Sequence, residues 1–371
     1  MSEKKKVDTG TDIFSHNTKK KKHNIKLILT NVFLSVVLVF STLAFVGIEL
    51  LNARILQKSD IGTETGDFEQ IITSTNENVA YFLVVGTDLS QRLTDIVMVV
   101  CYDLSNNSLN IMQLPRDTYI GSEAGYTKKL NAVYSNAREG EAKINALIRT
   151  INTRFGLPID HYVTVTIPGF RDIIDYIGGL DITLDKKYRI EDSRPCDKGG
   201  EAIPITIGPG EVHLDGFEVE GLIRNRKDSE DGSDIGRVKS QRMVYAAIAK
   251  KMTSISFAQV SKIVTNCMDD VSTDLQLGQM LGYAQKLNQL KLDEIKIKAL
   301  PGQFYNANGQ SYFAAHKQSY LDIINADFFP YETKILTVDD ITLVEPQTTF
   351  RPNLFDDDDT TLDDFDTQKD K

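Results

Sequence analysis

The sequence predicts an α/β domain, with a central mixed β-sheet between helical layers, preceded by one transmembrane helix. Short apolar runs of strand type alternate with segments of helical periodicity between residues 79 and 330, as α/β layers require. A separate uninterrupted apolar run lies near the N-terminus. The chain has 371 residues, of which 41% are hydrophobic and 25% are charged. This is sufficient for one large core.

The N-terminal apolar run covers residues 27–48 and contains no formally charged side chain. At about 1.5 Å per residue, a helix of this length crosses a hydrocarbon layer of about 30 Å. A cleaved signal peptide is the alternative, but Glu49 to Arg54 continue in a helical, partly charged pattern. Residues 1–26 carry eight lysines against three acidic residues, and basic flanks stay cytoplasmic. We therefore expect a single-pass protein of the cell membrane, with a cytoplasmic N-terminus and an extracellular domain.

Composition divides the chain into five parts. Residues 1–26 form a cytoplasmic stub that is too polar to fold, and residues 27–48 form the transmembrane helix. Residues 49–78 form a stalk or docking segment interrupted by glycines. The folded domain covers residues 79–330. Residues 331–371 form a C-terminal extension that ends in an aspartate-rich tail, which we expect to be disordered.

The folded domain begins with three predicted strands. Residues 79–86 and 95–102 are apolar, β-prone runs typical of strands buried on both faces of a sheet. A polar turn at 105–107 separates the second run from a third strand at 108–114. The spacing predicts a hairpin.

Helices and strands then alternate. A helix is predicted over 141–155, where apolar residues recur at helical spacing before Gly156. A strand at 161–166 leads into a helix opened by Pro168. A further strand covers 180–184.

The remainder of the domain is mainly helical. Residues 185–209 are rich in glycine, proline and charge, which predicts an exposed excursion or hairpin. Asp215 caps a helix that runs to about Ile223. The elements expected after it are helices over 237–252, 256–268, 275–290 and 316–326, and a strand over 294–300.

The charge balance argues against a nucleic-acid-binding protein. The formal net charge is −10, whereas non-specific nucleic-acid affinity requires a basic face. A polyanion would have to bind locally, through clustered arginines. Cys101, Cys196 and Cys267 have unrelated spacing, which predicts at most one disulfide bond.

Two carboxylates flank the first two strands. Asp88 follows the first strand and Asp95 begins the second. If these strands are neighbours, both side chains project at one sheet edge, where they suit a hard cation such as Mg²⁺, or alternatively Mn²⁺. Aspartates also flank strands simply because they favour turns.

Four arginines and a glutamine add basic and amide groups at other predicted element ends. Arginine presents a fixed fork of donors that matches phosphate oxygens. Singly, each arginine also fits a loop ion pair or a helix terminus. Together with the two carboxylates they indicate a site for a metal-bound pyrophosphate. These residues are Arg116, Arg224, Arg226, Arg237 and Gln241.

The residues around these positions resemble the LytR-CpsA-Psr family of Gram-positive cell-wall enzymes. The resemblance covers roughly residues 79 to 300, in order and with ordinary spacing. Its most distinctive segments are Leu114 to Tyr119 and Ile159 to Val163. The other matching segments are 84–95, 95–119, 129–134, 156–184, 214–226 and 236–242.

The resemblance implies a phosphotransferase that moves a phosphate-linked glycopolymer, such as capsule or teichoic acid, from undecaprenyl pyrophosphate to peptidoglycan. By position, Asp88 and Asp95 are similar to the family's magnesium-binding pair. The pyrophosphate-binding positions fall on Arg116, Arg224, Arg226, Arg237 and Gln241, and the catalytic ones on Asp95, Arg116 and Arg226. The resemblance also implies an apolar cavity for the lipid, with candidate lining residues Val97, Val99, Ile111, Phe170, Ile174, Ile177 and Ile248.

One position departs from the family pattern. The family usually has arginine two residues before the second aspartate, and this chain has Leu93 there. Two alternatives to the transferase therefore stay open. One is a non-catalytic or regulatory paralogue that binds lipid-linked precursor. The other is a pyrophosphatase that hydrolyses the same substrate with water as the acceptor.

Overall fold

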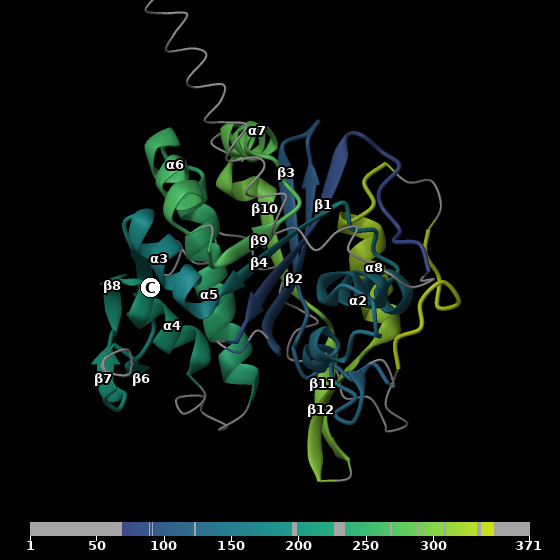
Figure 1. Ribbon diagram of the computed structural model, residues 1–371, viewed down its shortest axis with the longest axis horizontal. Helices are drawn as coiled ribbons and strands as arrows, with labels where there is room; N and C mark the ends of the chain where they lie inside the picture. The colour runs from purple at the N-terminus through teal and green to yellow at the C-terminus, as the bar shows by residue number, and fades with distance from the viewer. Residues whose placement is uncertain are drawn as a thin grey trace, which may run out of the picture. The chain divides into compact units, whose positions relative to one another are not determined.

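Six strands form a mixed central sheet in the computed structural model of the chain (Figure 1). The strand order is β10-β3-β2-β1-β4-β9. β1 is antiparallel to β2 and parallel to β4, and β3 is parallel to β10. The mixed sheet predicted from the sequence is confirmed. The strands are β1 Val79–Thr87, β2 Thr94–Asp103, β3 Ser108–Gln113, β4 His161–Thr166, β9 Val271–Thr273 and β10 Ile295–Ala299.

The structure describes residues 69–344 except 89, 91, 122–123, 195–198, 226–233, 268, 288, 308 and 332–334. These residues all belong to one compact unit, Ile55–Lys371. The predicted transmembrane helix 27–48 and the aspartate-rich tail lie outside the described residues. None of the helices within the described ranges is long and apolar enough to span a bilayer.

The helices form close to their predicted positions. The stretch predicted over 141–155 is α2 followed by one π-helical turn, η4 Ile151–Phe155, which ends at Gly156 with a φ of +71°. Glycine adopts this left-handed conformation without steric cost. The helices are α2 Lys143–Thr150, α3 Ile167–Tyr176, α4 Gly216–Arg224, α5 Asp234–Met252, α6 Phe257–Asn266, α7 Leu277–Leu287 and α8 Lys317–Asp327, with short 3₁₀ turns η2 Leu130–Ala132, η3 Tyr134–Asn136 and η6 Leu292–Glu294.

Three two-stranded ribbons accompany the central sheet. The excursion predicted over 185–209 contains the hairpin β6–β7, and the predicted strand at 180–184 pairs with β8. The hairpin β11–β12 projects beyond the central sheet in Figure 1. β8, β9, β11 and β12 were not expected from the sequence. The ribbon strands are β5 Leu180–Leu184, β6 Tyr188–Asp192, β7 Ile203–Ile207, β8 Gly210–Leu214, β11 Gly302–Ala307 and β12 Gln310–Ala315.

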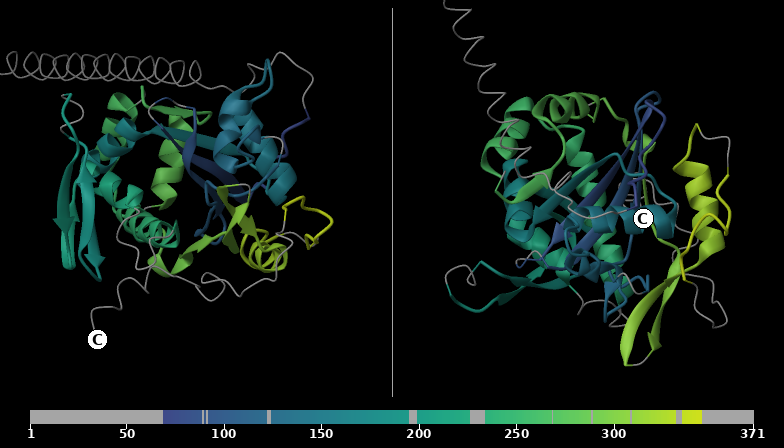
Figure 2. Two further views of the ribbon diagram at one scale, coloured as in Figure 1. Left: turned by 90° about the horizontal axis from the view of Figure 1, so that it is seen from below. Right: turned by 45° about the vertical axis from the view of Figure 1, so that its right-hand side comes forward.

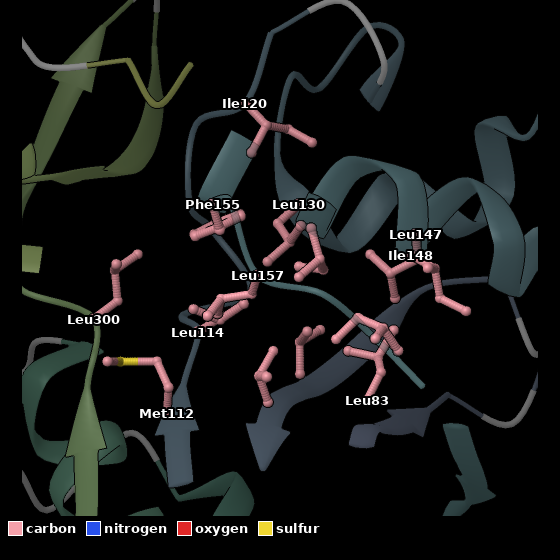
Figure 3. Close-up of a cluster of buried hydrophobic side chains, with 14 of the residues drawn as sticks. Leu83, Met112, Leu114, Ile120, Leu130, Leu147, Ile148, Phe155, Leu157 and Leu300 are labelled. Carbon is pink, nitrogen blue, oxygen red and sulfur yellow. The ribbon is translucent and has the colours of Figure 1, made fainter. Parts of the chain in front are cut away.

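One face of the central sheet carries a densely packed core. Tyr81, Leu83 and Val85 of β1 point to this face because alternate residues of a strand share a face. They pack with side chains from α2, η4 and α8, and Leu83 and Leu147 are among the buried residues drawn in Figure 3. This cluster provides most of the apolar burial on the α2 and α8 side.

The opposite face of the sheet is covered by a different group of helices. Figures 1 and 2 show α3, α4, α5 and α6 on the side of the sheet away from α2 and α8. The strand residues on this side are only partly buried, as the alternation of buried and intermediate positions along β1 and β2 shows. Partial exposure beneath a helical layer indicates empty space between the sheet and its cover.

Candidate functional site

A cavity of about 700 Å³ lies between the second face of the sheet and the helices α3, α5, α6 and α7. Its floor is formed by alternate side chains of β1 and β2, including Phe82, Val84, Met98 and Val100. Almost the whole lining is apolar. A cavity of this kind suits a hydrocarbon ligand, because ligand sites are concave and mostly apolar with a few convergent polar groups.

Five of the seven predicted lining residues border the cavity, and two do not. Ile111, Phe170, Ile174, Ile177 and Ile248 are among its walls. The expectation for Val97 and Val99 was wrong. Their side chains point into the opposite core and are 1% and 0% exposed, while Ile96, Met98 and Val100 face the cavity.

Most polar groups of the lining gather at one end of the cavity. The end of β1, the start of β2 and the end of β4 meet at one edge of the sheet, as their pairing requires. Arg116 follows β3 at this same edge. The lining also includes Thr253, Tyr102, Tyr245 and Tyr283, and the polar lining residues at this end are Thr87, Asp95, Arg116, Thr166, Glu220, Arg224 and Gln241. We call this end the cavity mouth.

Arg116 and Asp95 are in direct contact at the cavity mouth. Arg116 Nη1 lies 2.5 Å from Asp95 Oδ1, and the two side chains are 22% and 32% exposed. Arg116 Nε is 3.5 Å from Asp117 Oδ2, and Lys129 Nζ contacts the other oxygen of Asp117 at 2.9 Å. The loop ion pair considered for Arg116 is therefore present, and the same guanidinium also reaches Asp95.

Asp88 lies at the same edge but is engaged by its own loop. Its carboxylate accepts from Ser90 Oγ at 2.6 Å and from the amides of Arg92 and Leu93 at 2.8 and 3.2 Å. Burial alone would raise the pKa of Asp88, but these hydrogen bonds hold it below its ordinary value. The carboxylate is thus ionised and oriented, and it also stabilises the turn between β1 and β2.

Of the three arginines predicted in the α4–α5 region, the structure describes the side chain of Arg224 alone. Arg224 ends α4 at the cavity mouth, where its side chain is 59% exposed and Nη1 lies 2.7 Å from Glu220 Oε1. Arg226 lies outside the described residues. Arg237 belongs to α5, but its side chain is not among those described.

Gln241 is buried and joins three elements. Its Nε2 donates to the Ile223 carbonyl at 3.2 Å, and its Oε1 accepts from Gln113 Nε2 at 2.6 Å. Gln113 ends β3 and is 3% exposed, and its Oε1 has no hydrogen-bond partner. Gln113 was not predicted to belong to the site, because a glutamine at a strand end has no distinctive pattern.

Glu220, Arg171 and Ser193 form a second polar group that sequence reasoning missed. Arg171 Nε lies 2.6 Å from Glu220 Oε2, and Ser193 Oγ donates to the same oxygen at 2.9 Å. Burial by itself would raise the pKa of Glu220, but hydrogen bonds from Arg171 and Arg224 hold it below the ordinary value. The four-residue spacing between Glu220 and Arg224 was the available signal.

The residue types at the mouth fit a divalent cation only in part. Asp88 and Asp95 offer hard oxygen ligands, and Mg²⁺ is commonly held by one or two carboxylates with phosphate oxygens completing its coordination. Within the described ranges no group of three or more His, Cys, Asp or Glu side chains could hold a metal on its own. A cation at this edge would therefore depend on oxygens from a ligand.

Comparison with known proteins gives a consistent match. A model of the LytR_cpsA_psr family matches residues 52–328. The chain is 29% identical over 226 residues to the polyisoprenyl-teichoic acid–peptidoglycan teichoic acid transferase TagV of Bacillus subtilis (strain 168), covering 59% of this chain and 55% of that protein. It is 27% identical over 265 residues to TagU of Bacillus cereus, covering 69% and 80%. The chain thus spans about half the length of TagV.

Solved structures share the fold. The crystal structure of B. subtilis TagV aligns with a TM-score of 0.55 at 25% identity, covering 67% of this chain and 95% of that chain. A structure described as TagT bound to LIIa-WTA aligns with a TM-score of 0.54 at 20% identity, covering 71% and 94%.

Proposed function

Since the chain belongs to the LytR_cpsA_psr family, we propose that it transfers a phosphate-linked wall glycopolymer from a polyprenyl-pyrophosphate carrier to peptidoglycan. The observation that carries the proposal is the division of the cavity lining. The walls are apolar, and the charged lining residues, Asp95, Arg116, Glu220 and Arg224, all lie at the cavity mouth. The other ionisable lining residues are Tyr102, Tyr245 and Tyr283. A ligand that matches this division has a long hydrocarbon chain and an anionic head group. Undecaprenyl pyrophosphate carrying a glycan has that composition.

Similar proteins support the polymer class. The similar proteins TagV and TagU are described as transferases of teichoic acid from a polyisoprenyl carrier to peptidoglycan. We infer that teichoic acid or a related polymer, such as capsule, is the donor here. The pyrophosphate would lie at the cavity mouth and the glycan outside it.

The mouth residues suit substitution at phosphorus. The acceptor hydroxyl oxygen attacks the phosphorus that carries the glycan, and the bond from that phosphorus to the bridging oxygen of the pyrophosphate breaks. Asp95 takes the hydroxyl proton, and polyprenyl monophosphate leaves. Arg116 and Arg224 present fixed guanidinium groups where negative charge grows on the leaving phosphate. Arg226, Arg237 and Gln241 are assigned to the same pyrophosphate by their positions in the sequence.

A magnesium ion is part of the proposal. Asp88 and Asp95 would hold it together with pyrophosphate oxygens, and the ion would neutralise charge on those oxygens. Asp88 would give up hydrogen bonds from its loop to do so. Mn²⁺ would serve the same role with the same ligand types.

We also propose that the domain acts outside the cell, anchored by residues 27–48. Support comes from the uncharged apolar run and from the eight lysines that precede it. The carrier lipid lies in the membrane, so an anchor keeps the cavity near its ligand. Peptidoglycan and the membrane are then both partners of the protein.

The test uses the full-length protein in detergent with a synthetic polyprenyl-pyrophosphate oligosaccharide, magnesium and peptidoglycan fragments. We expect glycan to become attached to peptidoglycan, and we expect a chelator to abolish the reaction. Release of free phosphoglycan without transfer would identify a pyrophosphatase. Binding of the lipid with neither product would identify the regulatory paralogue.

A further inference from the structure

A buried ion pair lies directly beneath one arginine of the cavity mouth. Glu220 is 3% exposed and sits on α4 one turn before Arg224. One of its oxygens accepts from Arg171 and Ser193, and the other accepts from Arg224 at 2.7 Å. Arg171, Ser193 and Arg224 thus all donate hydrogen bonds to the Glu220 carboxylate.

The base of this arrangement is rigid. Arg171 lies on α3, is 7% exposed and has its guanidinium carbon 4.4 Å from the centre of the Phe217 ring. α3 and α4 approach closely here, since a Cβ added at Gly216 would lie 2.4 Å from the Arg171 carbonyl oxygen. Glu220 is therefore fixed by a side chain that itself cannot move far.

Arg224 has the opposite character. Its side chain is 59% exposed and stands at the last turn of α4. A free arginine in such a place samples many rotamers, and ordering it on ligand binding costs entropy. The contact with Glu220 removes part of that freedom before any ligand arrives.

We propose that Glu220 is a positioning residue for Arg224, held by Arg171, and that this pair aims Arg224 at the pyrophosphate of the bound lipid. The inference rests on the proposed function, because it assumes that a polyprenyl pyrophosphate occupies the cavity. Arg224 contacts Glu220 through Nη1, which leaves the remaining donors of its planar fork for phosphate oxygens. Releasing Arg224 would leave a buried Glu220 oxygen without its partner, so the tether persists in the complex.

A double-mutant cycle tests the tether. The background variant Arg171→Met/Glu220→Leu removes the buried pair but keeps apolar volume, which commonly preserves folding. Arg224→Ala is then made in the natural and in the background protein, and binding of farnesyl pyrophosphate is measured on each full-length protein by calorimetry. In the natural protein we expect Arg224→Ala to weaken binding roughly tenfold, as for loss of a charged hydrogen bond.

In the background protein we expect Arg224→Ala to weaken binding less than about threefold, because an untethered arginine contributes little. The same loss in both backgrounds would overturn the inference, since Glu220 would then act only on folding. If the background variant does not fold, Glu220→Gln replaces it, with the same expected reduction. A thermal unfolding curve on each variant shows whether the Arg171→Met/Glu220→Leu protein folds, and therefore whether it or Glu220→Gln serves as the background.

Arg194 supplies the matched control. Its guanidinium carbon is 5.6 Å from the same Phe217 ring, but it pairs with Asp192 and Asp215 rather than with Glu220. Arg194→Met should leave the roughly tenfold effect of Arg224→Ala unchanged. If the natural protein binds no farnesyl pyrophosphate, the proposed function and the inference both fail. If it binds and the cycle is additive, only the inference fails.

Discussion

Arg116 connects two carboxylates that have different surroundings. Asp95 faces the cavity mouth, whereas Asp117 is 7% exposed and paired with Lys129. The guanidinium is fixed by both, and its Nε has no hydrogen-bond partner in the structure. Asp117 lies 3.5 Å from this Nε, so the contact there is an ion pair rather than a hydrogen bond, and the Nη1 contact with Asp95 is the one that faces the cavity mouth.

Replacement of Arg116 should remove transition-state stabilisation. We expect Arg116→Ala to reduce transfer roughly 10²-fold or more, the effect typical of deleting one preorganised donor. The measurement is the rate of glycan transfer at saturating donor, alongside a thermal unfolding curve. Arg138→Ala is the control, because Arg138 pairs with Glu69 away from the cavity and its side chain is 56% exposed. A loss below about threefold for folded Arg116→Ala would contradict this role and leave Arg116 with only its ion pairs to Asp95 and Asp117.

Leu93 is an exposed apolar side chain in the loop between Asp88 and Asp95. It is 38% exposed and does not border the cavity, and its amide donates to Asp88. A role for Leu93 in holding the lipid chain is therefore unsupported.

Leu93→Arg should accordingly be tolerated. We expect unchanged thermal stability and tighter binding of farnesyl pyrophosphate, since an added guanidinium approaches a charged ligand from solvent. Calorimetric titration and a melting curve report the two quantities. Leu93→Gln, a polar change without charge, should leave binding unchanged. Reduced stability together with weaker binding would show that Leu93 packs against the ligand after all.

At the scale of elements, alternate residues of β2 face the packed core on one side of the sheet and the cavity on the other. Val99 is 0% exposed in the core, while its neighbour Val100 faces the cavity. The sequence located this strand correctly but not its orientation. A run that is apolar on both faces has no hydrophobic alternation, so the parity of its residues cannot be read from it.

The two neighbouring valines should therefore respond differently to the same enlargement. Val99→Phe inserts a ring into a filled core and should lower the free energy of unfolding by about 1–3 kcal/mol. Val100→Phe should leave stability nearly unchanged and weaken the binding of long polyprenyl pyrophosphates. Denaturant unfolding and lipid binding measure the two effects. Equal destabilisation by both substitutions would contradict the presence of free space on the helical side.

The contact between α3 and α4 depends on the absence of a side chain at Gly216. We expect Gly216→Ala to destabilise the fold by about 1–3 kcal/mol, because its Cβ would meet the Arg171 backbone. Gly282 in α7 is the matched helical control, with nothing within 4 Å of an added Cβ. Gly282→Ala should raise stability by roughly 0.5–1 kcal/mol. Chemical denaturation measures both changes in the free energy of unfolding. Changes of the same sign would contradict the close α3–α4 contact at Gly216.

The elements that were not predicted from the sequence were missed for different reasons. β9 has three residues, which is too short for a periodic pattern. β11 and β12 flank an Asn-Gly dipeptide at 308–309, which is a strong hairpin signal, so this hairpin was predictable from the sequence. Contacts between distant segments, such as Arg171 with Glu220, depend on tertiary packing that no local pattern contains.

At the scale of the whole molecule, the sequence implies three compartments for one chain. The lysine-rich stub, the apolar run and the folded domain would lie in the cytoplasm, the membrane and the exterior. Cys101 and Cys267 are both buried in the folded domain. Native thiols at these two positions are therefore poor reporters of topology.

A cysteine-free variant with one cysteine placed between residues 356 and 371 tests this topology. We expect an impermeant thiol reagent to label it on intact cells that lack a barrier outside the membrane. The same cysteine placed within residues 1–26 should react only after lysis. Protection of the tail cysteine on intact cells would contradict the predicted extracellular location of the folded domain.

The difference between the two faces of the sheet also bears on turnover. On the proposed function, transfer of the glycan would remove part of the lipid's anionic head group but none of its apolar contact with the cavity walls. The walls would then bind the spent carrier nearly as tightly as the loaded one, and we expect release of the spent lipid to limit turnover. The rate of turnover would depend on how fast that lipid returns to the bilayer.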